Sequence, residues 1–265
     1  MASEFDLIDR YFRSSDLPDD VTLGVGDDAA LLNIPEGEQL VVTVDTLISG
    51  VHFPVHTSPE DIGHKALAVN LSDLAAMGAE PKWITLALSL PEADEAWIEA
   101  FAKGFTQLAV RHGVSLVGGD TTRGPLSITV QAMGWVNNGM ALLRSGATPG
   151  DAVYVSGSIG AAGLALNMLH DSQAQIPDGL IARLNRPEPR IELGSALHNM
   201  ANACIDVSDG VIADLGHILE SSVVGAELQL ADMPYSDEVS QWISAGNNPV
   251  LPLSWGDDYE LLFTA

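Results

Sequence analysis

The chain has 265 residues, and 46% of them are hydrophobic, which is enough to fill one large core or two ordinary ones. Its formal charge is −25, because 11 Lys and Arg stand against 36 Asp and Glu. So few cations cannot displace counterions along an extended contact, which argues against nucleic acids and anionic membranes as partners. The single cysteine, Cys204, excludes an intramolecular disulfide and a cysteine-based zinc or iron–sulfur site.

The N-terminal segment MASEFDLIDRYF lacks the charged and then apolar pattern of a signal peptide. No apolar run approaches the length that spans a bilayer. We therefore expect a soluble, cytoplasmic protein.

The first half of the chain predicts alternating strands and helices. We expect strands over 40–46, 83–90, 114–120 and 126–136 and helices over 58–77 and 94–111. Ser58 and Pro59 suit the start of the first helix, while Gly78 and Gly113 suit the ends of the two helices. The order β-α-β-α-β-β resembles a ferredoxin-like α+β domain, predicted here over 1–137.

The second half predicts a separate α/β domain over 151–265. Asn, Gly and Pro gather over 138–150, which we interpret as a linker. Strands are expected over 151–157, 203–208 and 259–264 and helices over 159–170, 188–202 and 210–220. An apolar last strand with no closing turn predicts that this domain is truncated at Ala265.

Aspartates recur in glycine- or hydroxyl-rich turns, mostly where an apolar stretch ends. The turns are GVGDDAALL, VVTVDTL, NLSDLAAMGA, VGGDTTRG, IDVSDG and WGDDYELLF. Two unit charges 4 Å apart repel by about 4 kcal/mol at an effective dielectric of 20, so clustered carboxylates need a cation. Oxygen ligands favour Mg²⁺ or Ca²⁺ over Zn²⁺. The alternative is turn and N-cap chemistry, which suits any one motif alone.

Two motifs carry further alternatives. Asp73 and Asn70 lie one turn apart on a largely apolar predicted helix, and they either face a metal, which we favour, or form a satisfied core hydrogen bond. Ser208 precedes another predicted helix, so the helix amides could hold an anion or Ser208 could simply be the N-cap.

Together these motifs, with RSGATPGD, resemble those of the thiamine-monophosphate kinases, and the resemblance runs from about Glu4 to Thr264. It implies direct in-line phosphoryl transfer from ATP to thiamine monophosphate, giving thiamine diphosphate and ADP on several Mg²⁺ ions. It also implies a homodimer whose N-terminal sheets combine across the interface. Rival interpretations are another ATP-using member of the same superfamily, related to aminoimidazole ribonucleotide synthetase, and a non-enzymatic cation-binding protein.

The resemblance also assigns residues. The implied magnesium ligands are Asp28, Asp45, Asp73, Asp120 and Asp206, with Thr43 and the Val44 backbone assisting and Asp209 holding a further ion. Of these, Asp45, Asp73, Asp120 and Asp209 are expected to act in catalysis. The implied nucleotide contacts are Gly119, Asp120, Arg144 and Ser208, and the implied acceptor contacts are His52 and Asp257. Two positions depart from the family: Val44 replaces a hydroxyl residue, and Asp257 replaces a glutamate.

Overall fold

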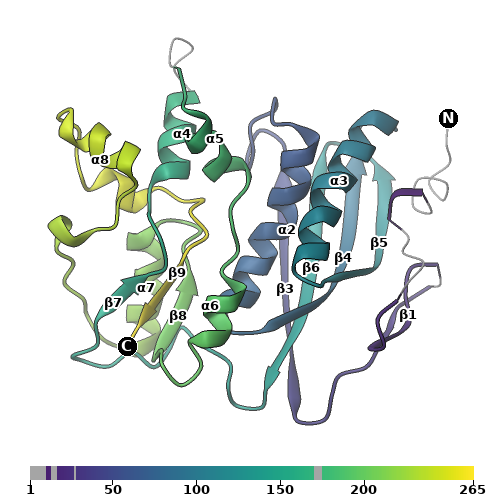
Figure 1. Cartoon of the computed structure of the whole chain (residues 1–265), viewed down its shortest axis with the longest axis horizontal. Coiled ribbons are helices and arrows are strands. Elements are labelled where there is room, and N and C mark those ends of the chain that lie inside the picture. The colour runs from purple at the N-terminus through teal and green to yellow at the C-terminus, as the bar shows by residue number, and fades with distance from the viewer. Residues whose placement is uncertain (1–9, 13–16, 27, 170–174) are drawn as a thin grey trace. The chain divides into compact units, whose positions relative to one another are not determined.

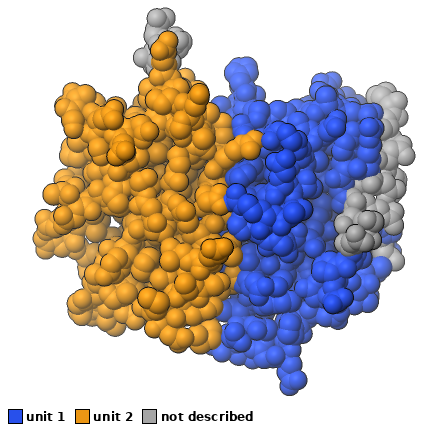
Figure 2. All heavy atoms as spheres, viewed as in Figure 1, with its two compact units in different colours: residues 1–74, 80–139 blue, residues 75–79, 140–265 orange. Residues whose placement is uncertain are grey.

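The computed structural model describes residues 10–12, 17–26, 28–169 and 175–265. The chain divides into two compact α/β units, shown in blue and orange in Figure 2. Unit 1 consists of 1–74 and 80–139, and unit 2 consists of 75–79 and 140–265. The domain and linker boundaries drawn from the sequence stay a prediction. Within the described ranges, no helix is long and apolar enough to cross a membrane.

Unit 1 is built on a four-stranded sheet of order β3-β6-β4-β5 (Figure 1). Its strands are β3 (Glu38–Ile48), β4 (Glu80–Leu90), β5 (Ser115–Arg123) and β6 (Ser127–Asn137). Strand β6 lies between β3 and β4 and runs antiparallel to both, whereas β4 and β5 are parallel. Helix α2 (Pro59–Ala76) therefore links β3 to β4 in a split β-α-β unit, and α3 (Glu95–Arg111) links β4 to β5.

The helices and strands predicted for the first half of the chain are confirmed in type and order, with ends that differ by a few residues. Gly78 and Gly113 end the helices with φ of 67° and 65°, as expected. Asp94 caps α3 by accepting hydrogen bonds from the amides of Ala96 and Trp97. The ferredoxin-like classification stays a prediction.

The two helices of unit 1 lie on one face of the sheet and touch each other backbone to backbone (Figure 1). A Cβ atom on Gly104 would come 1.9 Å from the Glu60 carbonyl oxygen, and one on Gly63 would come 2.2 Å from that of Phe101. Only glycine permits this approach. Residues 62–72 of α2 are all buried.

Part of the other face is covered by the hairpin of β1 (Val21–Leu23) and β2 (Leu31–Leu32). There Val21 packs with Trp83 and Val117. The edge strand β3 keeps Leu40, Val42 and Val44 exposed, the last at 58%. An apolar stripe on an edge strand is unusual for a surface and is considered below.

Unit 2 contains a three-stranded antiparallel sheet of order β7-β9-β8. The strands are β7 (Val153–Val155), β8 (Ala203–Asp206) and β9 (Leu261–Thr264). Its helices are α4 (Ala161–Leu169), α5 (Asp178–Asn185), α6 (Ile191–Ala196), α7 (Val211–Ser222) and α8 (Asp237–Ser244), with 3-10 turns η1 (Leu230–Asp232) and η2 (Leu251–Ser254).

Two features of unit 2 differ from the expectation. The helix predicted over 188–202 is only the six residues of α6, because the chain turns after Ala196 and Asn199 adopts φ of 61°. Helices α5 and α8 were not predicted, since both are short and their apolar residues form no long periodic run. Residue 170, the predicted end of the preceding helix, lies outside the described residues.

Candidate active site

Two of the predicted carboxylates meet in unit 1. Asp45 lies on β3 and Asp73 on α2, and their side chains are hydrogen-bonded to each other. The Thr43 hydroxyl donates to Asp73 Oδ2 at 2.5 Å from the same face of β3. Because strand residues two apart share a face, β3 presents Thr43 and Asp45 together toward α2.

Placing these carboxylates side by side changes their acidity. Burial, together with the charge and hydrogen bond of Asp73, raises the pKa of Asp45 to about 6. Two like charges at this range disfavour simultaneous ionisation unless a cation lies between them. The local chemistry is that of a cation-binding pair with only oxygen donors.

Asn70, next to this pair on α2, is fully buried and hydrogen-bonded. Its Oδ1 accepts from the Asp45 amide at 3.1 Å, and its Nδ2 donates to the Ala66 carbonyl at 3.0 Å. The metal-facing interpretation of Asn70 is therefore wrong, because its side chain forms the satisfied core hydrogen bond that was the alternative. Asn70 instead fixes the backbone that carries Asp45.

Val44 lies between Thr43 and Asp45 and so points to the opposite, exposed face of β3. The Val44 side chain therefore takes no part in the acidic pair. Only its backbone could be the assisting magnesium ligand that the family resemblance implies. Asp28 is exposed in the turn between β1 and β2, and its neighbour Asp27 lies outside the described residues.

The sheet register places Asp120 away from the acidic pair. Across the strands, Asp45 is aligned with Val130, Leu86 and Gly119, while Asp120 belongs to the adjacent row with Ala87 and Thr129. Adjacent rows point to opposite faces, so Asp120 and Asp45 do not share one. Three strand spacings separate β3 from β5, about 14 Å between these backbones. Within unit 1, Asp120 is thus not part of the Asp45–Asp73 pair.

Gly119 has a packing explanation. A Cβ atom there would come 2.0 Å from the Leu86 carbonyl oxygen on the neighbouring strand. The contact between β4 and β5 requires glycine whether or not a phosphate binds nearby. The nucleotide role of Gly119 stays a prediction.

His52 lies exposed in the loop after β3, and Lys65 anchors this loop from α2. The His52 Nδ1 accepts from the Ile48 amide at 3.0 Å, so a neutral ring carries its proton on Nε2 and can donate from there. Lys65 is 1% exposed, and its Nζ donates to the His52 carbonyl at 3.3 Å. The loop thus presents His52 in a fixed orientation.

In unit 2, the turn that carries Ser208 and Asp209 is held by a carboxylate of its own chain. Asp214 is buried, and its Oδ2 accepts hydrogen bonds from the amides of Ser208, Asp209 and Gly210, each at 3.0 Å. The sequence left open that amides at the start of this helix hold an external anion, but Asp214 occupies the amides of the turn. The N-cap of α7 is Gly210, with no side-chain cap bond, so the Ser208 N-cap interpretation is also wrong.

A second loop, Gly256 to Tyr259, is paired with this turn through the backbone. The Asp257 amide donates to the Ser208 carbonyl at 2.9 Å, and the Tyr259 amide donates to that of Val207 at 2.8 Å. Asp257 and Tyr259 adopt φ of 68° and 50°, and the Tyr259 hydroxyl donates to Asp257 Oδ1 at 3.2 Å. Non-glycine residues in this region cost energy, which indicates that the surroundings impose the conformation.

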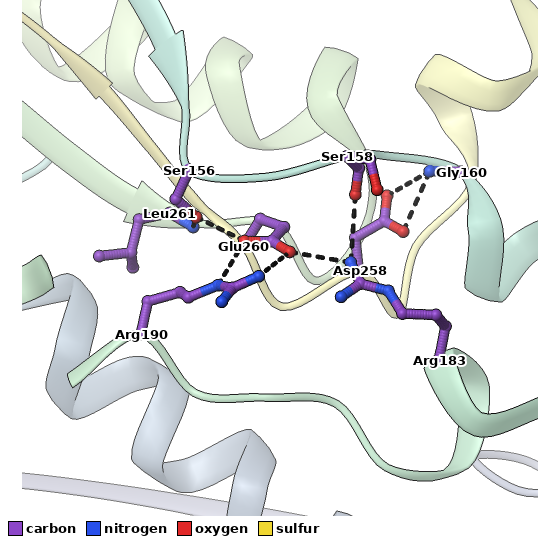
Figure 3. A network of polar contacts seen from close by, with 8 residues as sticks. All are labelled: Ser156, Ser158, Gly160, Arg183, Arg190, Asp258, Glu260 and Leu261. Atoms are coloured by element: carbon purple, nitrogen blue, oxygen red, sulfur yellow. Dashed lines mark hydrogen bonds and ion pairs between the residues drawn. The ribbon is translucent and has the colours of Figure 1, made fainter. Parts of the chain in front are cut away.

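The surroundings that hold this loop form a buried ionic network around Glu260 (Figure 3). Arg190 donates to both oxygens of the Glu260 carboxylate at 2.6 Å, Arg183 donates to Oε1 at 2.8 Å and the Ser156 hydroxyl donates to Oε2 at 2.5 Å. Burial alone would raise the pKa of Glu260, but these donors together hold the pKa below its usual range.

Asp258 secures the other side of the loop. Both of its carboxylate oxygens accept from the Gly160 amide, which directly precedes α4 (Figure 3). Burial raises the pKa of Asp258 to about 7, against the opposing effects of that amide and of Arg183. Asp258 and Glu260, which both follow Asp257 in the chain, are thus structural carboxylates that hold this loop.

The two remaining predicted residues lie elsewhere in unit 2. Asp206 ends β8 and is 4% exposed, and Arg144 is exposed in the turn before β7. A hollow of about 510 Å³ beside β7 and α7 contains none of the predicted site residues. Across the described residues, no three His, Cys, Asp or Glu side chains come together as a metal-binding cluster. The assigned metal, nucleotide and acceptor roles therefore stay proposals.

Several residues that shape the site were not identified from the sequence. Asp214 and Glu260 were passed over because a carboxylate in a helix or at the start of a strand is most often exposed. One signal was available for Arg190, which ends the Pro-rich turn RPEPR, because such a turn is unusual between two short helices. No local pattern showed that Arg190 would pair with Glu260, which is 70 residues away.

Comparison with known proteins is consistent with this geometry. The chain matches the family models of the AIR synthase related proteins, the N-terminal domain over residues 26–136 and the C-terminal domain over 148–265. It is 53% identical to the thiamine-monophosphate kinase of Escherichia coli K12 over 98% of this chain and 82% of that protein.

Two solved structures extend the comparison. The thiamine-monophosphate kinase of Stenotrophomonas maltophilia has a TM-score of 0.87 and 53% identity, covering 93% of this chain and 81% of that one. A ThiL complexed with AMPPCP and TMP has a TM-score of 0.79 and 35% identity, covering 91% of this chain and 79% of that one. The chain therefore belongs to the thiamine-monophosphate kinase family of the AIR synthase related proteins.

Proposed function

We propose that this kinase transfers the γ-phosphoryl group of ATP directly to the phosphate of thiamine monophosphate, on magnesium ions held by its aspartates. The observation that carries the proposal is the contact of Asp45 with Asp73 beside the Thr43 hydroxyl. The ThiL relative was solved with AMPPCP, an ATP analogue, and with TMP, which supports ATP as the co-substrate here.

The donor set fits magnesium. Asp45, Asp73 and Thr43 supply only oxygen atoms, and the raised pKa of Asp45 reflects carboxylates that a divalent cation would neutralise. Mg²⁺ held by these residues would offset the negative charge of donor and acceptor. The protein's part is to hold these carboxylates in place, and the hydrogen bond from the Asp45 amide to Asn70 fixes the backbone that carries Asp45. No strong base is required, because the acceptor is already a phosphate oxygen.

Other residues take binding roles in this proposal. Asp206 and Asp209, in unit 2, would hold metal ions, and Arg144 and Ser208 would contact the nucleotide. His52 and Asp257 would contact the acceptor, His52 as a donor from Nε2. Asp28, Asp120, Gly119 and the Val44 carbonyl keep the roles that the family implies. The rigid loops around His52 and Asp257 support these assignments, because a fixed geometry lowers the entropy cost of alignment.

We also propose that the protein is a homodimer and that its N-terminal sheets combine at the interface. The support is the exposed apolar stripe of Leu40, Val42 and Val44 on the edge strand β3. A lysine in this stripe would bury a charge on association. Val44→Lys should therefore shift the molecular mass measured by light scattering from dimer toward monomer, whereas Val110→Lys, at an exposed site on α3, should leave it unchanged. A wild-type monomer would contradict the proposal.

Product analysis tests the activity directly. The protein, incubated with Mg²⁺, ATP and thiamine monophosphate, should yield thiamine diphosphate and ADP in equal amounts by chromatography. Asp73→Asn should abolish turnover with the fold intact, whereas Asp19→Asn, at an exposed site of unit 1, should not. No thiamine diphosphate from the wild type, or near-normal rates from Asp73→Asn, would overturn the proposal or its metal role, respectively.

The two rival interpretations predict other outcomes. Another ATP-using member of the superfamily would consume ATP with a different acceptor. A cation-binding protein would gain stability from Mg²⁺ but not from nucleotide. An ATP analogue at 100 times its dissociation constant should stabilise the kinase by roughly 2.7 kcal/mol.

A further inference from the structure

A single hydroxyl group holds the turn that carries Arg144. Ser222 Oγ accepts hydrogen bonds from the amides of Gly146 and Ala147, each at 3.1 Å, and donates to the Arg144 carbonyl at 3.3 Å. A serine hydroxyl has one donor and two acceptor positions. All three are used on one four-residue turn.

These contacts do not serve the helix to which Ser222 belongs. Ser222 is the last residue of α7, and the amide of Val223 closes the helix on the carbonyls of Glu220 and Leu219. The three bonds of the hydroxyl instead reach a turn about 75 residues earlier in the chain. A helix-capping role therefore does not account for Ser222.

The same turn is fixed from other sides. The Leu143 carbonyl accepts from the Cys204 amide at 2.8 Å. Gly146 adopts φ of 125°, and a Cβ atom there would come 2.3 Å from the Asn202 carbonyl oxygen. The backbone on both sides of Arg144 is thus held in place, with Ser222 supplying the side-chain contacts.

The backbone of Arg144 is held in place, but its side chain is not. The Arg144 residue is exposed, and within the part of the chain that the structure describes its guanidinium group forms no hydrogen bond or ion pair. A planar guanidinium group whose donors are not used within the protein can bind phosphate oxygens with two parallel hydrogen bonds. Because the backbone that carries it is already fixed, the turn need not change on binding.

We infer that Ser222 is a positioning residue that fixes the Arg144 turn so that Arg144 can bind the phosphates of the nucleotide. The inference rests on the proposed function, which assigns Arg144 to the nucleotide. It adds a residue that acts through Arg144 and touches no substrate itself.

The test compares four variants. Ser222→Ala removes the hydroxyl, Ser222→Thr keeps it, Ser221→Ala alters the exposed preceding residue, and Arg144→Ala removes the cation. The measured quantities are the Kd for AMPPCP with Mg²⁺, the KM for each substrate, kcat and the melting temperature. The Kd gives a readout that does not depend on turnover.

We expect Ser222→Ala to raise the Kd for AMPPCP and the KM for ATP about fivefold. This is the change in an equilibrium constant that corresponds to the loss of one typical hydrogen bond. The KM for thiamine monophosphate and kcat should stay within about twofold. Ser222→Thr should restore nucleotide affinity, and Ser221→Ala should match the wild type. In the Arg144→Ala background, Ser222→Ala should add nothing, because its effect passes through Arg144.

The outcomes separate the inference from the proposed function. If Arg144→Ala weakens nucleotide binding and Ser222→Ala does not, Ser222 has no positioning role and the nucleotide role of Arg144 stands. If neither variant changes the Kd, Arg144 does not bind nucleotide. If Ser222→Ala alters both KM values and the melting temperature alike, or adds fully to Arg144→Ala, the hydroxyl is merely structural and the inference is overturned.

Discussion

The two units use carboxylates in opposite ways. In unit 1, Asp45 and Asp73 face each other on a regular strand and helix, and burial together with the charge of Asp73 raises the pKa of Asp45. In unit 2, Asp214 and Glu260 are buried deeper, yet each is surrounded by donors that hold a loop in place. The difference teaches that burial does not identify a binding carboxylate. What distinguishes the unit 1 pair is that two carboxylates contact each other directly, beside the Thr43 hydroxyl.

The largest effect should come from the Glu260 network. Glu260→Gln removes the charge between Arg183 and Arg190 and leaves two cations poorly compensated. Breaking a buried ion pair on one side costs about 3–5 kcal/mol, so the free energy of unfolding should fall by this amount in denaturant titrations. Glu220→Gln, on the exposed side of α7, should change it by less than about 0.5 kcal/mol. Equal effects would show that Glu260 is no more structural than a surface charge.

The second effect on stability concerns Asp214. Asp214→Ala leaves the amides of Ser208, Asp209 and Gly210 without their acceptor, which should cost about 3 kcal/mol. Asp214→Asn should cost less, because its carbonyl oxygen can accept the same three bonds. Hydrogen exchange of these amides measures the effect locally. If they stay protected in Asp214→Ala, another group holds the turn.

Asp258 should give a pH-dependent effect. Its pKa rises from 3.8 unfolded to about 7 folded, so between these values the native state binds more protons than the unfolded state. Its contribution to stability is therefore full below about pH 4 and is lost as the pH rises through about 7. The difference between wild type and Asp258→Asn should change by on the order of 2 kcal/mol between about pH 5.5 and 8 in thermal unfolding. A constant difference would contradict the raised pKa.

The smallest effect, with the opposite sign, should come from unit 1. At pH 7, above the pKa of Asp45, Asp73→Asn removes a like-charge contact and should raise stability by about 1 kcal/mol in chelator. The same change should remove the stabilisation that Mg²⁺ gives the wild type. Asp19→Asn should do neither. Lower stability in chelator would show that Asp73, like Asp214, is mainly structural.

Periodicity and capping residues predicted unit 1 well. Ser58 and Pro59 at the start of the first helix and the glycines at 78 and 113 placed the helix ends, because these signals are local. The position of Asp120 was not predictable in this way, since its face depends on the register of β5 with β4. The short helices α5 and α8 lacked enough turns to show a period.

The site itself was predictable only in part. Sequence motifs pointed to Asp45 and Asp73, whereas Asp214 and Glu260 could be recognised only after distant segments had been brought together. Asp214 shows this most clearly, because its spacing from Ser208 is visible but the direction of its side chain is not. A buried carboxylate that satisfies backbone amides has the same sequence signature as one exposed on a helix.

The place of β9 in its sheet has a consequence for how the protein is made. Strands β7 and β8 hydrogen-bond only to β9 within that sheet, and β9 is the last of the three to be synthesised. Ser156 and Glu260, which join β7 to β9, are 104 residues apart in the chain. Closing a loop of that length is slow, so on the ribosome β7 and β8 must wait unpaired while the sheet of unit 1 already has all its strands. Unit 2 is therefore where chaperone dependence and aggregation during synthesis should concentrate.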